Sequence, residues 1–358
     1  MSMNRAKIIA DPIPERYARG WHCLGSAQKY KDGKPHTVNA FGYRLVVFQT
    51  SDGALQVLDA WCPHMGGDLS HGRLENDNVV CPFHGWQFDR EGKATSIPYC
   101  KRVPPKARVG RWATAELNEA LFIWHDPDGN PPIEGLEIPR LKELYSPEYS
   151  EMHWAEWVIN ANSRELVDNI VDMGHFDETH QSPSLFFANL FEDHKATQVQ
   201  ISGSRIMSAG EAVITYATYY GPGVLLVSLK GPYKGHYMET IYIVGNTAID
   251  HNSFTLHFGV ATKFIPGLSK AENQQLIAEW TELQQVALGT DVAIWDNKVR
   301  IGNPMLCESD GPIYHARKWY DQFFQPINEA SEESTRRYEH EIDMDYVGVK
   351  PELRHLRG

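Results

Sequence analysis

The chain contains two short segments that each combine one cysteine with one histidine. The first is Cys62-Pro-His64, and sixteen residues separate it from the second, Cys81-Pro-Phe-His84. Two thiolates can hold one iron of a two-iron, two-sulfide cluster while two imidazoles hold the other iron. Because neutral imidazoles replace two anionic thiolates, the potential of such a cluster lies above that of an all-cysteine one. These four residues are therefore our first candidate metal ligands.

The same four residues also fit a tetrahedral zinc site with two cysteines and two histidines. Zinc modules usually pair like with like, whereas each segment here is mixed, so we favour the cluster. Tight ligand loops are indicated by the turn-forming residues Pro63, Gly66, Gly67, Pro82 and Gly85. Trp86 follows the second loop directly, and we expect it either to cover the cluster or to be an ordinary core residue.

A second candidate metal site lies in the segment DMGHFDETH, residues 172–180. Two imidazoles and one carboxylate on one face of iron(II) leave positions open for oxygen and substrate. On a straight helix His175 and His180 would point about 140° apart. We therefore expect the helix to end near Gly174, or His180 to lie on the following turn. Taken alone, two structural histidines are the better interpretation, but a one-electron cluster in the same chain needs an acceptor and favours iron.

The missing carboxylate is expected on a long helix running from Ala271 to about Ile301. With Leu276 set at 0°, a predicted buried stripe contains Trp280, Leu283, Ala287 and Ile294. Asp291 falls at roughly 60°, on the edge of the stripe, and Asp296 at roughly 200°. Since a buried carboxylate needs a cation or a metal, Asp291 is our third ligand. Asp296 is the alternative if Gly289 interrupts the helix.

Asp172 needs a role of its own, because it precedes His175 by three residues and shares its helix face. Its carboxylate can orient a metal-bound histidine by a hydrogen bond. It can equally reach a cluster histidine on another domain and link the two metals. Asn169 is either an amide supporting the site or, in our preferred interpretation, a helix-surface residue.

Strand patterns around the first ligand set predict a small all-β domain over residues 1–130. FGYRLVVFQT and ALQVLDA, separated by Ser51-Asp52-Gly53, read as a hairpin within residues 40–60. ALFIWHD, residues 120–126, reads as a closing strand. The Pro- and Gly-rich sequence that follows predicts a linker over residues 131–150.

The remainder, residues 151–358, has the pattern of a second domain. A helix is predicted over residues 161–173, with apolar residues spaced by four and three. Four β-rich runs follow at 211–220, 223–230, 236–245 and 254–264. An antiparallel sheet gripping the long helix would enclose a largely apolar cavity. The expected fold class is α+β, with an all-β domain followed by a helix-grip domain.

Composition excludes several classes of protein. The 358 residues are 42% hydrophobic and 22% charged, as in ordinary globular proteins, and the net charge of -12 argues against nucleic-acid binding. We expect no membrane span and no signal peptide. Five cysteines, an odd number with two assigned to the cluster, fit a reducing cytoplasm.

Together these motifs resemble the Rieske non-heme iron oxygenases along nearly the whole chain. Respiratory Rieske proteins carry two further cysteines, where this chain has Gly67 and Phe83, so the loops resemble the low-potential Rieske domains of ferredoxins and oxygenases. Within the family, the chain is most similar to the oxygenase components of bacterial 3-ketosteroid 9α-hydroxylases. The resemblance rests on CPHMGGDLSHG, PYCKRVPPKARVG, DMGHFDETH and the segment from Asp291 to Phe324.

That resemblance implies a set of cofactors and partners. The [2Fe-2S] cluster would be bound by Cys62, His64, Cys81 and His84, and a mononuclear Fe(II) by His175, His180 and Asp291. Asp172 would correspond to the acid that bridges cluster and iron between neighbouring subunits of a homotrimer. Electrons would come from NAD(P)H through a separate flavin and iron-sulfur reductase, since this chain has no GxGxxG motif.

The leading hypothesis is therefore a monooxygenase that hydroxylates a bulky apolar substrate, a 3-ketosteroid or related steroid, with O2. Desaturation, O-demethylation and aromatic-ring dioxygenation use the same metals and stay open. A hypothesis of a different class is a Rieske electron carrier with an appended ligand-binding domain, which would hold no iron at His175.

Overall fold

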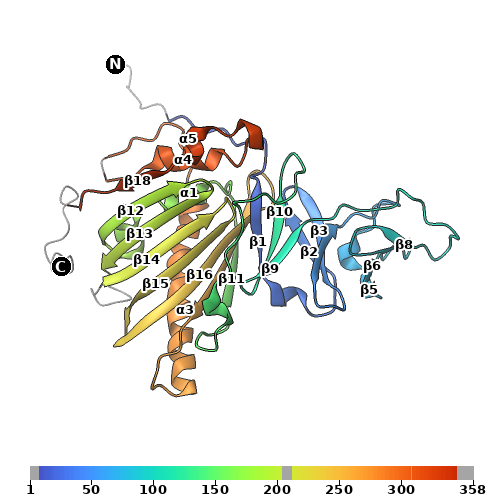
Figure 1. Ribbon diagram of the computed structural model, residues 1–358, viewed down its shortest axis with the longest axis horizontal. Coiled ribbons are helices and arrows are strands. Elements are labelled where there is room, and N and C mark those ends of the chain that lie inside the picture. Colours follow the sequence, from blue (N-terminus) through green and yellow to red (C-terminus); the bar gives the residue numbers. More distant parts are fainter. Residues whose placement is uncertain (1–7, 204–211, 308, 345–358) are drawn as a thin grey trace.

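The computed structural model describes residues 8–203, 212–307 and 309–344. The protein has two lobes, a narrow one built of small sheets and a broad one built around a single large sheet (Figure 1). Both consist mainly of antiparallel strands, and helices join them in the second lobe. This arrangement confirms the predicted α+β class.

Three small sheets form the narrow lobe. One has the order β1-β10-β9, the second β2-β3-β4, and the third β5-β6-β7-β8. The strands are β1 (Gly20–Ser26), β2 (His36–Ala40), β3 (Tyr43–Gln49), β4 (Leu55–Asp59), β5 (Arg73–Glu75), β6 (Asn78–Val80), β7 (Gln87–Phe88), β8 (Ala94–Ser96), β9 (Thr114–Leu117) and β10 (Ala120–His125).

The predicted hairpin is formed by β3 and β4. Its tight turn is closed by a hydrogen bond from Thr50 N to Ala54 O, and Gly53 has a φ of 86° that favours glycine. Val46 and Leu58 of the hairpin pack in the same core cluster as Cys62 and Cys81. The hairpin therefore shares its hydrophobic core with the cysteines of both ligand loops.

One eight-stranded antiparallel sheet forms the broad lobe, in the order β11-β17-β16-β15-β14-β13-β12-β18. Its strands are β11 (His153–Ile159), β12 (Ser184–Glu192), β13 (Lys195–Gly203), β14 (Ala212–Tyr220), β15 (Val224–Tyr233), β16 (His236–Ala248), β17 (Phe254–Thr262) and β18 (Tyr338–Glu341). Of these, β14 to β17 correspond to the four predicted runs, the first of which began at residue 211, outside the described residues.

A long helix, α3 (Lys270–Trp295), lies across the sheet (Figure 1). It starts with a capping box in which the Ser269 side chain accepts from Glu272 N and the Glu272 side chain accepts from Ser269 N. The helix ends at Trp295, six residues before the predicted end at Ile301. Gly289 does not interrupt it.

Short helices carry the segment that leads to the candidate histidines. The predicted helix over 161–173 is wrong in extent, because only α1 (Glu165–Asn169) is helical there. Asp168 O accepts hydrogen bonds from both Val171 N and Asp172 N, which tightens and closes the last turn. A new helix, α2 (His175–His180), begins after Gly174.

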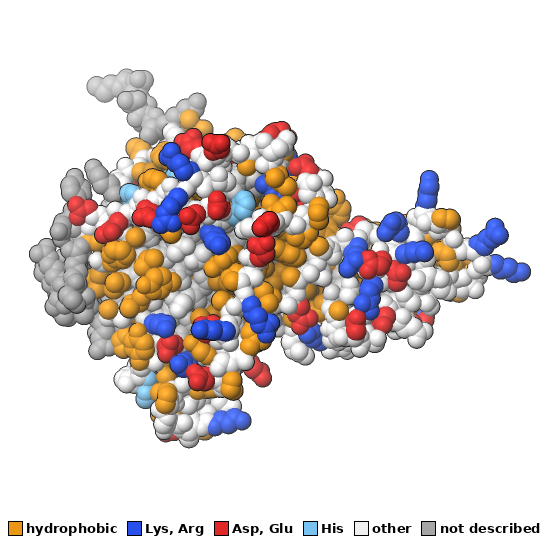
Figure 2. Space-filling model, viewed as in Figure 1, with side chains coloured by type: hydrophobic (Ala, Val, Ile, Leu, Met, Phe, Trp, Pro, Cys, Tyr) orange, Lys and Arg blue, Asp and Glu red, His pale blue; other side chains and the backbone are white. Residues whose placement is uncertain are grey.

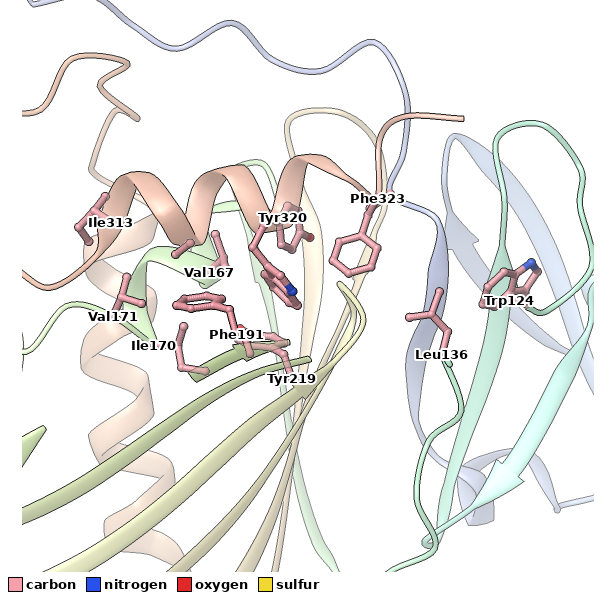
Figure 3. Packing of buried hydrophobic residues seen from close by; sticks show 14 residues of the cluster. Trp124, Leu136, Val167, Ile170, Val171, Phe191, Tyr219, Ile313, Tyr320 and Phe323 are labelled. Atoms are coloured by element: carbon pink, nitrogen blue, oxygen red, sulfur yellow. The ribbon is translucent and has the colours of Figure 1, made fainter. Parts of the chain in front are cut away.

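A cluster of buried aromatic and aliphatic side chains holds α1 in place (Figure 3). Val167 of α1 packs beneath α4 (Ile313–Asp321), whose Trp319 is fully buried, and against Phe191 of β12. The cluster extends to Trp124 on β10 and so also joins the two lobes. One further short helix, α5 (Glu332–Thr335), lies next to α4.

Buried ion pairs add to this packing. Arg317 of α4 donates to both carboxylate oxygens of Asp168, at 3.1 Å to Oδ1 and 2.6 Å to Oδ2. Arg300 lies 3.2 Å from the same carboxylate, and Lys298 lies 2.6 Å from Glu165. Removing one partner of such a buried pair strands the other charge, so the network fixes α1 against α4.

The segment between the lobes, predicted as a linker over 131–150, is irregular apart from one 3-10 helix, Lys142–Tyr145. The domain boundaries at 130 and 150 stay predictions. No helix in the described ranges is long and apolar enough to cross a membrane.

Candidate active site

The two cysteine–histidine segments form matching loops at the end of the narrow lobe. Cys62 N donates to Gly67 O at 2.8 Å and Gly66 N donates back to Cys62 O at 2.9 Å. The second loop repeats this pattern between Cys81 and Trp86, with Gly85 N donating to Cys81 O. Gly66 and Gly85 have φ values of 73° and 72°, a conformation that glycine adopts without strain.

These loops bring the two histidines together. The Nδ1 atoms of His64 and His84 lie 3.2 Å apart, and the ring centroids are 4.5 Å apart. Trp86 stacks on His64 with centroids 4.9 Å apart and an interplanar angle of 11°, and its Nε1 donates to Tyr99 Oη. Trp86 also belongs to the lobe's core, as one of the two expectations had it, while its covering of the cluster stays a prediction.

The cysteines suit a metal cluster better than a pair of free thiols. Both are buried, without a disulfide, and burial together with the neighbouring Cys81 raises the pKa of the Cys62 thiol. A thiolate there needs a metal cation beside it. A Cβ on Gly67 would lie only 2.7 Å from Cys81 Sγ, so a side chain at 67 would have to displace this thiol, and Phe83 is 58% exposed. Two thiols and two converging imidazoles therefore match the ligands of a Rieske cluster.

A second ligand set lies in the broad lobe, where α2 packs against α3. One ligand atom each from His175, His180 and Asp291 lies within 4.8 Å of the other two. His180 Nε2 is 3.2 Å from Asp291 Oδ2, and the two imidazole centroids are 5.3 Å apart. The two histidines are the first and last residues of the six-residue α2, and their ligand atoms converge with that of Asp291 on α3.

The hydrogen bonds of these side chains leave ligand atoms free. His175 Nδ1 lies 2.7 Å from Asp172 O, which assigns the proton to that nitrogen, while His175 Nε2 is buried without a partner among the described residues. Asp291 is 5% exposed. A buried carboxylate beside two imidazoles is costly without a cation, so the group fits the two-histidine, one-carboxylate iron site.

The competing carboxylate lies elsewhere. Asp296 follows the last turn of α3, is exposed, and accepts a hydrogen bond from Asn160 N at 2.7 Å. The predicted stripe was wrong in one respect, since Ile294 is 43% exposed. The buried face is rotated toward polar residues that line a cavity, which places Asp291 inside it and not on its edge.

Asp172 lies just before α2 and accepts hydrogen bonds from the first backbone N–H groups of that segment. Its Oδ1 accepts from Gly174 N at 3.0 Å, and its Oδ2 lies 3.5 Å from His175 Nδ1. Burial alone would raise the pKa of Asp172, but the hydrogen bonds from His175 and the backbone lower it overall. The carboxylate is 40% exposed, so one side of it is available to another group.

Two adjoining chambers lie between the sheet and α3, with cavity volumes of about 160 and 190 Å³. Their mainly apolar lining with a few polar groups is typical of small-molecule sites. Phe176, His180 and Asp291 line both chambers. The other walls are mainly apolar and include Val213, Leu229, Val244, Phe258 and Leu288 in the first chamber, and Leu166, Ile170, Val227 and Trp295 in the second.

Sequence reasoning missed a polar strip on one wall of this cavity. Gln198, Gln200 and Ser202 alternate along β13 and are buried on the cavity side. Gln198 Nε2 donates to Gln200 Oε1, and Gln200 Nε2 donates to Ser184 Oγ. Asn169 also lines the second chamber, whereas we had preferred to place it on the helix surface. Strict alternation of polar residues was the signal available for β13.

Comparison with known proteins agrees with this geometry. A model of the 3-ketosteroid 9α-hydroxylase C-terminal domain matches residues 123–324, and a Rieske [2Fe-2S] domain model matches residues 20–107. The oxygenase component of a 3-ketosteroid-9-alpha-monooxygenase from Rhodococcus rhodochrous is 44% identical over 94% of this chain and 90% of its own. This chain belongs to that family of Rieske oxygenases. The resemblance inferred from the motifs is confirmed.

Two further comparisons support the assignment. The corresponding oxygenase component from Mycobacterium tuberculosis is 40% identical over 94% of this chain and 89% of its own. The crystal structure of dicamba monooxygenase bound to dicamba has a TM-score of 0.72 at 18% identity, covering 88% of this chain and 100% of that chain, and shows the shared fold.

Family membership establishes the class of chemistry. The protein is a Rieske-type monooxygenase that uses an iron-sulfur cluster and a non-heme iron. Its relatives are named as oxygenase components, so each of them is one part of a system of several proteins. The match to a Rieske domain favours the cluster over the zinc alternative.

Proposed function

We propose that this oxygenase hydroxylates a 3-ketosteroid or a closely related steroid at a carbon in the interior of the ring system. One observation carries the proposal: His180 and Asp291 line both chambers of the cavity, so space extends to either side of them. A long, rigid, apolar molecule can fill both chambers only with its middle beside these residues. The relatives named above act on 3-ketosteroids at position 9, which lies inside the nucleus.

The proposed metal ligands follow from the two sites. Cys62, His64, Cys81 and His84 would hold the [2Fe-2S] cluster, and His175, His180 and Asp291 would hold Fe(II). A ferrous ion bound there supplies the activation of O2. The hydrogen bond from His175 Nδ1 to Asp172 O keeps His175 Nε2 deprotonated as a ligand. Phe176 and Val244 line the cavity and would exclude water from the bound steroid.

Electron delivery supports a role for Asp172 and for a homotrimer. The ligand loops lie near β6 and β8 at the outer end of the narrow lobe, whereas α1 and the strands that line the cavity lie in the broad lobe (Figure 1). Within one chain, electrons would have to pass from one lobe to the other. A neighbouring subunit that brings its cluster loops to the exposed side of Asp172 would shorten the path. Electrons would enter the cluster from NAD(P)H through the reductase.

The test is coupled turnover with a panel of substrates. Purified protein, a flavin and iron-sulfur reductase and NADH would be supplied with 3-ketosteroids, bile acids or methoxyarenes. We expect steroid-dependent oxygen uptake with one hydroxylated product. Oxygen uptake and product only with methoxyarenes would contradict the proposed substrate class.

A second assay separates the enzyme from an electron carrier. His175→Ala should remove about one iron per chain and abolish turnover, while the visible spectrum of the cluster stays intact. Unchanged iron content in this variant would favour the electron carrier.

A further inference from the structure

A basic segment follows the second ligand loop. Residues 92–115 contain six lysines and arginines and no acidic residue: Lys93, Lys101, Arg102, Lys106, Arg108 and Arg111. The whole chain has a net charge of -12, so without the +6 of this segment the remainder carries -18. The cluster is therefore flanked by a basic surface on an otherwise acidic protein.

Five of these cations form no ion pair with any residue in the described ranges. The sixth, Arg111, forms an ion pair with Glu91, and the neighbouring Arg90 forms one with Asp52. The five side chains are exposed: Lys93, Lys101, Arg102, Lys106 and Arg108. They are free to meet carboxylates of another protein. We call these five residues the basic surface.

The segment is anchored to the core that holds the cluster ligands. Ile97, Ala107 and Val109 are buried in the cluster that contains Cys62 and Cys81. Backbone hydrogen bonds join Ala94 N to Ala107 O and Ala107 N to Pro104 O. The lysines and arginines thus project from a folded support and not from a free tail.

Tyr99 brings the same segment against the cluster histidines. Its ring centroid lies 6.4 Å from that of His64 and 6.4 Å from that of His84, and its hydroxyl accepts the Trp86 hydrogen bond. The ring is 61% exposed. Figure 2 shows Lys and Arg side chains gathered at the tip of this narrow lobe. A protein docked on this tip would approach the cluster closely.

We propose that the basic surface is the docking face for the reductase component, which binds it through an acidic face around its own iron-sulfur or flavin cofactor. This inference rests on the proposed function only in requiring a separate reductase. Complementary charge raises association rates by roughly 10- to 1000-fold and orients the encounter. The -18 on the rest of the oxygenase would repel an acidic partner from other faces.

Charge reversal tests the proposal. The variant Lys101→Glu/Arg102→Glu/Lys106→Glu changes the charge by -6. The control Lys34→Glu/Lys142→Glu/Lys270→Glu makes the same change at exposed lysines outside the basic surface, which form no ion pair with any described residue. Stopped-flow absorbance would follow reduction of the cluster by a purified reductase of a 3-ketosteroid 9α-monooxygenase system. No steroid is needed, so a wrong substrate assignment leaves this result untouched.

We expect the variant Lys101→Glu/Arg102→Glu/Lys106→Glu, the basic-surface variant, to lose roughly 10- to 100-fold in the second-order rate constant of cluster reduction at low salt. This loss should shrink at high salt. The control should stay close to the wild-type rate. Equal losses in both triple variants, or no loss in either, would overturn the proposal. Sedimentation of both variants tests whether the basic surface instead binds another copy of this chain. Dissociation of the oligomer in the basic-surface variant alone would assign the surface to contacts between copies and overturn the proposal.

Discussion

Replacement of Asp291 by asparagine is the sharpest perturbation of the candidate iron site. The side chain keeps its size but loses the negative charge that neutralises part of the Fe(II) charge. Asp291 is the single carboxylate in the group of three within 4.8 Å, and it is 5% exposed, so water has little access to replace it.

A lower bound on the effect follows from these facts. Loss of a hydrogen-bond partner behind a metal ligand typically weakens binding by 10- to 100-fold. Loss of the ligand's own charge in a buried site should exceed this, so we expect Asp291→Asn to weaken Fe(II) binding by at least ~100-fold. That corresponds to about 2.7 kcal/mol.

Asp296→Asn is the matched control, because it makes the same chemical change five residues further along. Asp296 is exposed, and the substituting amide can still accept the hydrogen bond from Asn160 N. Anaerobic Fe(II) titration of each protein gives the affinity, with the cluster absorbance as an internal standard for protein folding. Weaker Fe(II) binding by the Asp296 variant and unchanged binding by the Asp291 variant would refute the assignment.

Three further predictions follow from single side chains. Asp172→Asn should keep both metals and normal cluster reduction but slow reoxidation of the reduced cluster by substrate and O2 in rapid mixing; reoxidation at the wild-type rate would exclude a bridging role. Gly67→Ala should lose cluster absorbance, because its Cβ would lie 2.7 Å from Cys81 Sγ, whereas Gly289→Ala, with nothing within 4 Å, should not. Burial lowers the pKa of His125 to about 4, so between pH 6.5 and 4 the unfolded chain binds a proton that the folded one excludes. The contribution of His125 to the free energy of unfolding should therefore fall by roughly 2 kcal/mol from pH 7 to pH 5, and His125→Gln should remove this part of the decline in denaturant titrations.

The sequence predicted the parts of the site whose chemistry is local. Each cysteine–histidine loop is closed by its own backbone hydrogen bonds, so spacing and glycine positions were sufficient to identify it. The choice of Asp291 over Asp296 depended only on helical rotation, and the structure places Asp291 inside and Asp296 outside. The roles of these residues as iron ligands stay predictions.

Other parts depended on tertiary context that periodicity does not record. The strands β12 and β13 were not predicted, because their buried positions include Asn189, Gln198 and Gln200, which face inward although they are polar. The predicted buried stripe of α3 was wrong at Ile294 for the same reason. Gln284, which lines the cavity, is buried, whereas Ile294 is exposed. A ligand cavity inverts the usual pattern, since its walls are buried without being wholly apolar.

The most direct test of the proposed activity is a reaction under isotopically labelled oxygen. Fully reduced oxygenase with reductase, NADH and a 3-ketosteroid would be exposed to ¹⁸O₂, and the product analysed by mass spectrometry and NMR. We expect one ¹⁸O atom in a new hydroxyl on an interior carbon of the steroid nucleus. A dehydrogenated steroid without ¹⁸O, or oxidation confined to one end of the molecule, would contradict it.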